Sequence, residues 1–497
     1  MTEPQRVDRR AFLARTAALG AGAALPAIAS ATPVSATTAP PDVEPRSRDL
    51  TELTIAEAAT LIRRGRLDPN DLLAAYRARI DRFDGVYQAF NHVAETQRPK
   101  RGVLHGIPLA IKDNYFTAGI PTTVNSFLFE GFTPPYDATA VARLRAAGAV
   151  LVGKTQMGPL ATTRATTPDG RITTVNAWAP NRPEVDPGGS STGTATAVAG
   201  RMAAGGTGTQ TGGSITAPSN AQNLTGLKPT MGRVSLHGIV PLSYTRDHPG
   251  PLARDAMDAA ILLSTMAGAD PADPRTQGLP RVPDLVTAAT PVRGRLRWPT
   301  RIGVLPGYTA DPFRKSFIDT LANVRGVTIV EVPLPEEWDP LTGGAFNNVR
   351  LPERSEPFLP YLATDLRKFG VSVLGWLQGA LLGANEYLIG QRAKTLLLER
   401  VLTDTFGRCD VVVQTGPVPF DILGLPELAL PIGFTADGLP VGAILGGQPF
   451  AEDRLLSIAA AYQAVTDWHH RRPADPTGAT IRAAGRLTAE QVAQTMQ

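Results

Sequence analysis

The feature that most constrains the fold is an alternation of short apolar runs with longer helical patterns, which begins near residue 106. The runs IPLAIK (107–112) and AVLVGK (149–154) have the length and apolar character of buried strands. The stretches ATAVARLRAAGA (138–149) and TGTATAVAGRMAAG (192–205) have helical patterns, and Gly, Ser and Thr fill the junctions. Because strands alternate with helices, the pattern predicts an α/β fold built on a sheet.

The same pattern returns in the second half of the chain. RIGVLPG (301–307) and VTIVEVPLP (327–335) read as strands on either side of a helical stretch. LALPIGFTADGLPVGAILGG (428–447) reads as two strands that turn at an Asp-Gly pair, the usual chemistry of a tight hairpin. The sheet is therefore expected to contain strands from both halves of the chain.

The amino-terminal segment has the pattern of a twin-arginine export signal. Arg9 and Arg10 precede an Ala/Gly/Leu-rich run, and small residues follow at 29–31. The run is too short and too rich in Ala and Gly to span a bilayer well. We expect cleavage after Ala31, with Ala36 as the alternative, and no stable membrane insertion afterwards. The mature protein is then expected to be periplasmic or extracellular.

Charge and cysteine content exclude several functions. The 497-residue chain has a net charge of +4, and removal of the expected signal, which carries four arginines and two acidic residues, leaves +2. Such a balance has no nucleic-acid footprint, so we expect no nucleic-acid partner. Cys409 is the only cysteine, so neither an internal disulfide nor a Cys-based metal cluster can form.

The expected organisation is one large domain between two short extensions. After the signal at 1–31, residues 32–48 form a Pro-rich tether, 49–475 a single domain and 476–497 a tail. The Pro-rich stretch 279–300 is the best candidate for a crossing to a mobile lobe.

The run GGTGTQTGGS (205–214) is the first candidate for chemistry. It lacks the Gly-Lys-Ser/Thr ending of a phosphate loop, and Thr211 stands where the dinucleotide pattern needs its third glycine. It is either a set of structural turns or an oxyanion loop, in which backbone N–H groups converge beside Ser214. The nearest histidine, His237, belongs to no evident triad. A serine nucleophile here would need another base.

Two further stretches offer partners for Ser214. Ser190 and Ser191 follow a glycine pair and precede a helical run, so they are either helix N-caps or functional hydroxyls. Lys112 ends an apolar run, where it either faces solvent or is buried, and burial would lower its pKa. A neutral lysine can serve as the base of a serine nucleophile. Deprotonating an ordinary lysine at neutral pH costs about 4–5 kcal/mol, which desolvation would have to offset.

These stretches together resemble the signature blocks of the amidase signature family. The resemblance rests on GIPLAIKDN, DPGGSSTGTATAVAG, GTQTGGSITAPSN, TGLKPTMGRVS and RDHPGPLARDAMDAA, and it extends from about Leu53 to Pro473. It implies the amidase-signature fold, in which helices cover both faces of a central, mixed, twisted β-sheet.

The resemblance also implies a Ser–cis-Ser–Lys triad without metal or organic cofactor. Ser214 would be the nucleophile, Ser190 would relay the proton after a cis bond from Gly189, and Lys112 would be the base. The oxyanion hole would be formed by the backbone N–H groups of Thr211, Gly212, Gly213 and Ser214.

Two positions beside the nucleophile depart from the family pattern. Gln210 stands where an aspartate is usual and Thr216 where an arginine is usual. Since the loss of one charge alone would leave the other uncompensated, we interpret the joint change as an ion pair replaced by a neutral Gln–Thr hydrogen bond.

The sequence therefore predicts an exported amidase that acts on a small-molecule amide or ester through an acyl-serine intermediate. Acyl transfer or ester cleavage by the same triad is one alternative, and a non-catalytic binding protein on an amidase scaffold is another. The family member that acts on misacylated tRNA shares the fold, but export and near-neutral charge argue against that role. A homodimer is left open.

Overall fold

The computed structural model describes residues 40–95, 97–292 and 294–477. The expected export signal at 1–31 and nearly all of the expected tail at 476–497 lie outside these residues.

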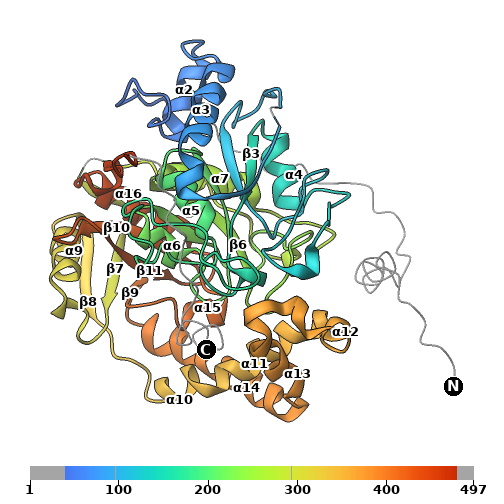
Figure 1. Ribbon diagram of the computed structural model, residues 1–497. Helices are drawn as coiled ribbons and strands as arrows, with labels where there is room; N and C mark the ends of the chain where they lie inside the picture. Colours follow the sequence, from blue (N-terminus) through green and yellow to red (C-terminus); the bar gives the residue numbers. More distant parts are fainter. Residues whose placement is uncertain (1–39, 96, 293, 478–497) are drawn as a thin grey trace, which may run out of the picture.

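Within the described residues, eleven strands form one mixed sheet in the order β1-β3-β2-β4-β6-β5-β10-β11-β9-β7-β8 (Figure 1). β2 runs parallel to β3 and β4, β7 runs parallel to β8 and β9, and the other pairs are antiparallel. The strands are β1 (Phe90–Val93), β2 (Pro108–Lys112), β3 (Val150–Thr155), β4 (Gly205–Gln210), β5 (Thr225–Lys228), β6 (His248–Ala253), β7 (Arg295–Val304), β8 (Arg325–Glu331), β9 (Val411–Gln414), β10 (Glu427–Phe434) and β11 (Pro440–Gly447). The predicted α/β class and mixed sheet are confirmed, and so is the hairpin expected within 428–447.

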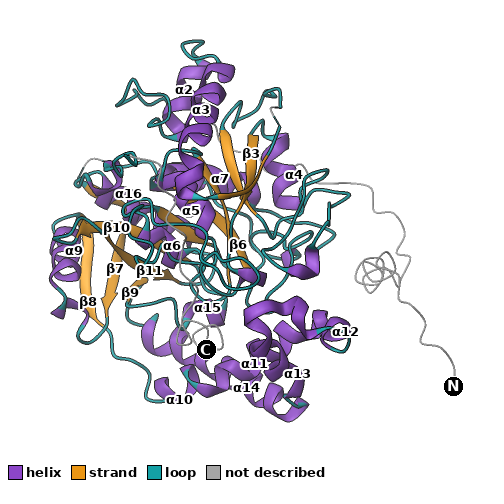
Figure 2. Cartoon of the chain, viewed as in Figure 1, coloured by secondary structure: helices purple, strands orange, loops and turns teal. Residues whose placement is uncertain are grey.

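Helices cover the sheet on both faces (Figure 2). The helices that surround it are α2 (Ile55–Arg63), α3 (Pro69–Tyr87), α4 (Thr139–Ala146), α5 (Thr192–Ala199), α6 (Thr216–Ala221), α7 (Ala256–Met266), α8 (Leu285–Ala288), α9 (Pro312–Ala322), α15 (Phe420–Leu423) and α16 (Glu452–Gln463). None of the helices in the described part of the chain is long and apolar enough to cross a membrane.

The alternation of side chains along β2 sets the position of its last residue. Leu109 and Ile111 face the large core cluster that includes α7 and α16, whereas Ala110 faces the smaller cluster built around α5. Because successive strand residues point to opposite faces, Lys112 lies on the same face as Ala110, toward α5. The parallel neighbour β4 ends at the same edge of the sheet. The fold thus brings Lys112, the start of α5 and the turn after β4 together.

A helical lobe between β8 and β9 was not predicted from the sequence. It contains α10 (Trp338–Thr342), α11 (Gly344–Ser355), α12 (Leu359–Leu362), α13 (Val373–Leu381) and α14 (Ala384–Arg400), which lie together beside the sheet in Figure 1. Trp376 anchors it within an aromatic cluster, whereas Leu381 is 85% exposed. The stretch 279–300 leads into β7 of the same sheet, so the sheet continues across the expected crossing.

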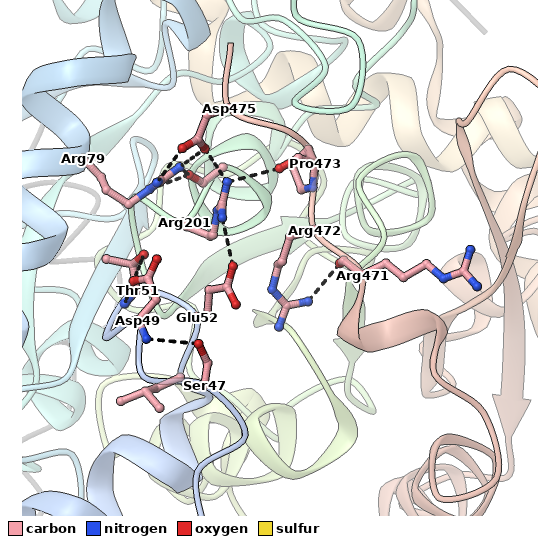
Figure 3. A network of polar contacts seen from close by, with 12 residues as sticks. Ser47, Asp49, Thr51, Glu52, Arg79, Arg201, Arg471, Arg472, Pro473 and Asp475 are labelled. Atoms are coloured by element: carbon pink, nitrogen blue, oxygen red, sulfur yellow. Dashed lines mark hydrogen bonds and ion pairs between the residues drawn. The ribbon is translucent and has the colours of Figure 1, made fainter. Parts of the chain in front are cut away.

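Ion pairs tie both ends of the described chain to the core (Figure 3). Asp475 accepts hydrogen bonds from Arg79 at 2.6 Å and from Arg201, and Arg201 also donates to Glu52 at 3.0 Å. Part of the expected tether is likewise held, because Asp42 pairs with Arg63 of α2 at 2.8 Å. Residues 40–48 therefore lie against the domain, since their acidic side chains meet the basic end of α2.

Candidate active site

Lys112 is fully buried, and its hydrogen-bond partners in the described part of the chain are all uncharged. Its Nζ donates to Ser190 Oγ at 2.9 Å, to Thr209 Oγ1 at 2.8 Å and to the Thr209 carbonyl at 3.2 Å. Burial lowers the pKa of Lys112 to about 7, and the charge of Asp247 opposes this shift. The sequence left open whether this lysine faces solvent, and the structure places it in the interior. Packing of α5 over the end of β2 produces this burial.

Ser190 lies in the turn that leads into α5. The peptide bond from Gly189 to Ser190 is cis, and the carbonyl of Ser190 accepts a hydrogen bond from the Gly158 N–H at 3.2 Å. The next residue, Ser191, occupies the N-cap position of α5, and its hydroxyl donates to the Thr209 carbonyl at 3.4 Å. The two adjacent serines thus have different partners, and only Ser190 contacts Lys112.

Ser214 lies in the tight turn between β4 and α6. It is 7% exposed, and its carbonyl accepts a hydrogen bond from the Ser191 N–H at 3.3 Å. Gly213 has φ +96°, and a Cβ there would lie 3.1 Å from Pro417, so both backbone conformation and space favour glycine. Among the described contacts, no hydrogen bond joins the hydroxyls of Ser190 and Ser214. Such catalytic contacts often shorten only when a substrate binds.

The backbone N–H groups of the turn are available to a ligand. Those of Gly212, Gly213 and Ser214 donate to no acceptor within the described part of the chain. Gly212 is also exposed, although its neighbours in the turn are buried. Together with the buried lysine, these N–H groups give the turn the composition of an acyl-transfer site.

The comparison with known families agrees with this geometry. The family model described as Amidase matches residues 82–339, a span that includes Lys112, Ser190 and Ser214. The chain belongs to the amidase family. Its members and relatives act on carbon–nitrogen bonds, and the chain is a hydrolase of this class.

Relatives of this amidase span nearly its whole length. A glutamyl-tRNA(Gln) amidotransferase subunit of Chloroflexus aggregans is 34% identical, and the match covers 86% of this chain and 99% of that protein. The peptide amidase of Stenotrophomonas maltophilia is 28% identical, with a TM-score of 0.67 over 86% of this chain and 99% of that one. The crystal structure of the amidotransferase subunit from Thermotoga maritima is 24% identical, with a TM-score of 0.72 over 87% of this chain and 99% of that one, and it supports the fold.

Gln210 fixes one side of the nucleophile turn. Its side-chain carbonyl accepts hydrogen bonds from the backbone N–H groups of Ile215 and Thr216 at 2.9 Å, and from the Thr216 hydroxyl at 3.2 Å. The neutral Gln–Thr hydrogen bond expected from the sequence is therefore present. The side-chain NH2 group of Gln210 donates to Glu427 Oε2 at 2.7 Å, so the same side chain also links the turn to β10.

The sequence analysis missed the carboxylate that holds Gln210. Glu427 is fully buried, lies 3.7 Å from Lys228 Nζ, and accepts a hydrogen bond from Gln414 at 3.3 Å. Burial raises the pKa of Glu427 well above its ordinary value, and the charge of Lys228 opposes that shift. A glutamate that begins the apolar run ELALPIGF was the available signal, because a buried charge requires a partner.

The other side of the turn is held by charged groups that the sequence analysis also missed. Arg246 donates to the Thr211 carbonyl at 2.8 Å and to Asp421 Oδ2 at 2.9 Å, and the Thr211 hydroxyl donates to Asp247. Arg246 and Asp421 are fully buried. Asp421 is 175 residues from Arg246 along the chain, so no local pattern links them.

Proposed function

We propose that this amidase cleaves a small-molecule carboxamide through an acyl-Ser214 intermediate. The observation that carries the proposal is the buried Lys112, whose pKa is about 7 and whose Nζ lies 2.9 Å from Ser190 Oγ. At pH 7 about half of a lysine population with this pKa is unprotonated and can accept a proton, as a general base requires. Ser190 then connects the base to the nucleophile turn.

The proposed reaction has two halves. Ser214 Oγ attacks the amide carbon as its proton passes through Ser190 to Lys112, and the N–H groups of residues 211–214 stabilise the oxyanion. The C–N bond breaks, and the leaving amine takes the proton back from Lys112 through Ser190. Water then attacks the Ser214 ester while its proton passes through Ser190 to Lys112. The ester C–O bond breaks, the acid is released, and the proton returns through Ser190 to Ser214 Oγ.

The adjacent serines provide a matched test. The mature protein would be screened against p-nitroanilides, primary amides and p-nitrophenyl esters of varied acyl chain length, with release of amine or phenol as the readout. Ser190→Ala should lower kcat by about 100-fold or more, as expected for loss of a proton-transfer group. Ser191→Ala should stay within about threefold of wild type, because its hydroxyl makes a single long contact to a carbonyl. Equal losses in both variants would contradict the relay role of Ser190.

Acyl transfer is the second candidate function. Relatives whose sequences match this chain over almost their whole length are amidotransferase subunits. This similarity supports transfer of the acyl group or of ammonia. Turnover would be repeated with added hydroxylamine and the products separated. A hydroxamate that forms faster than the acid would favour transfer, and unchanged acid release would favour hydrolysis. A folded protein that turns over none of these substrates would favour the binding-protein alternative.

We also propose export by the twin-arginine route. The support is the Arg9–Arg10 pair with the apolar run and small residues that follow it, all within the segment outside the described residues. Replacement of both arginines by lysine should retain the full-length chain in the cytoplasm. Mature protein with an amino terminus near residue 32 should be found outside it only for the wild type.

A further inference from the structure

The contact between Arg246 and the nucleophile turn involves the carbonyl of one particular peptide unit. Arg246 Nη2 donates to the carbonyl of Thr211 at 2.8 Å, and the N–H of that same peptide unit belongs to Gly212. Gly212 is exposed, and its N–H has no acceptor in the described part of the chain. One peptide unit thus faces a buried cation on its oxygen side and an open site on its nitrogen side.

A cation on a carbonyl oxygen strengthens the N–H of the same peptide. The guanidinium draws electron density toward the oxygen, so the amide nitrogen carries more positive character and its N–H becomes a better donor. Hydrogen bonds to charged groups are about twice as strong as neutral ones, which makes the polarisation larger than a backbone or hydroxyl donor would cause. Because this polarisation passes through the peptide unit, it requires no direct contact between Arg246 and the oxyanion.

We propose that Arg246 is a positioning residue that polarises the Thr211–Gly212 peptide and so strengthens the Gly212 N–H as an oxyanion donor. The inference rests on the proposed function. It assigns a role in the reaction to a buried ion pair, Arg246–Asp421, that stands outside the Ser–Ser–Lys set.

Two neighbouring side chains stabilise the positive charge of Arg246. Asp421 Oδ2 lies 2.9 Å from Nη2, and the ring of Phe346 covers the guanidinium, with its centroid 3.7 Å from Cζ. The acceptor and the ring compensate a cation that would otherwise be costly to bury.

The position of the turn does not depend on Arg246 alone. Gln210 binds the N–H groups of Ile215 and Thr216, and Asp247 accepts the Thr211 hydroxyl. The backbone is therefore held from three directions, and a neutral residue at position 246 leaves two of them intact. This allows the effect of the charge to be separated from the effect of the fixed geometry.

The test follows phosphonylation of Ser214 by a fluorophosphonate probe, whose phosphoryl oxygen would occupy the oxyanion hole. Arg246→Met removes the charge, and Arg246→Lys keeps it. Arg254→Met is the matched control, because Arg254 is also buried but donates to Leu53, Ala203 and Tyr76. For each variant, the maximal rate of inactivation and the probe concentration at half-maximal rate are measured, together with thermal stability.

We expect Arg246→Met to lower the maximal rate by about tenfold, less than the 100-fold or more that accompanies loss of a whole oxyanion donor. The half-saturating concentration should change by less than about twofold, because the polarisation acts mainly on the developing charge. Arg246→Lys should recover most of the rate, and Arg254→Met should lose stability with its rate unchanged.

An unchanged rate in Arg246→Met would overturn the inference while leaving the proposed function intact. So would equal losses in Arg246→Met and Arg246→Lys, or in Arg246→Met and Arg254→Met, because these results indicate a structural role only. Wild-type protein that the probe does not label at Ser214 would overturn the inference and the proposed function together.

Discussion

Lys112 is the last residue of β2 and Lys154 is the last but one of the neighbouring parallel strand β3; both are buried, yet their surroundings differ in one respect. Lys154 lies 3.2 Å from Asp113 Oδ1 and donates to the Thr122 hydroxyl. Lys112 has no carboxylate within hydrogen-bond distance in the described structure, and its partners are Ser190 and Thr209. Burial lowers the pKa of both lysines, but at Lys154 the adjacent carboxylate opposes the shift directly.

The difference shows how one fold makes a base and a structural cation from the same residue type. A paired lysine keeps its proton and its ion pair, whereas an unpaired buried lysine gives up its proton easily. A third buried lysine, Lys228, follows the paired pattern, because its carboxylate partner is Glu427. Burial alone therefore does not mark the base, and the absence of a counter-charge beside Lys112 does.

Removal of the unpaired lysine should have the largest effect. Lys112→Met keeps the length and apolar stem of the side chain but removes the proton acceptor. Amide turnover should fall by about 10⁴-fold, as for the loss of one member of a serine triad. The thermal unfolding temperature should stay the same or rise, because the substitution removes a buried amine that has no carboxylate partner. Activity within tenfold of wild type would show that another group acts as base.

Converting the Lys112 site to the paired type should have the next largest effect. Thr209→Asp places a carboxylate where Thr209 Oγ1 now lies, 2.8 Å from Lys112 Nζ. An adjacent opposite charge raises a lysine pKa by about 1–3 units. Since the neutral lysine is the active form, kcat/KM rises with pH through the wild-type pKa of about 7. In the variant this limb should move to higher pH, so activity at pH 7 should fall by about 10- to 100-fold.

Thr209→Asn is the isosteric control for that change. It should leave the midpoint of the pH profile near the wild-type value, because it adds no charge. A profile that moves equally in the Asp and Asn variants would contradict the view that a counter-charge separates the two kinds of lysine.

The Lys228–Glu427 pair reaches the nucleophile through Gln210, so charge changes at position 210 test the paired pattern. Gln210→Asp places a carboxylate against Glu427 Oε2, where an amide group now donates at 2.7 Å. We expect turnover to fall by about tenfold or more, as a buried like-charge pair is costly. The combination with Thr216→Arg should lose less, because the two new charges can pair. Equal loss in the single and double variants would contradict this pairing.

Replacement of Lys154, which is paired with Asp113, should have the smallest effect on the reaction. Lys154→Met leaves Asp113 buried without its cation, and breaking such a pair typically costs about 3–5 kcal/mol in the free energy of unfolding. Urea denaturation should show this loss. The pH profile of kcat/KM should keep its midpoint, and a shifted midpoint would mean that Lys154 takes part in the titration assigned to Lys112.

Local sequence patterns predicted the elements and the candidate nucleophile, because hydrophobic periodicity and turn chemistry are local properties. The alternating runs gave the α/β class, and the Asp-Gly pair in 428–447 gave the hairpin that the structure shows. The Gln210–Thr216 contact was also predicted, because the family resemblance indicates that these two residues jointly replace a pair of opposite charges.

The surroundings of these residues could not be predicted in the same way. The burial of Lys112 depends on how α5 packs against β2, and Glu427 reaches Gln210 across 217 residues of chain. Arg246 lies in a loop and Asp421 in the short helix α15, and no sequence pattern links these two segments. The helical lobe was missed because its apolar stretch, WLQGALLGANEYLIG, is typical of a core helix, yet the structure exposes much of it.

The most direct test of the account is the pH dependence of Ser214 labelling by a fluorophosphonate in wild type and in Lys112→Met. We predict an adduct on Ser214 whose rate of formation rises with pH through a midpoint near 7, the pKa of Lys112. In Lys112→Met this dependence and nearly all of the rate should be lost. A wild-type rate without that midpoint, or an adduct that forms equally fast without Lys112, would contradict the assignment of the unpaired lysine as the base.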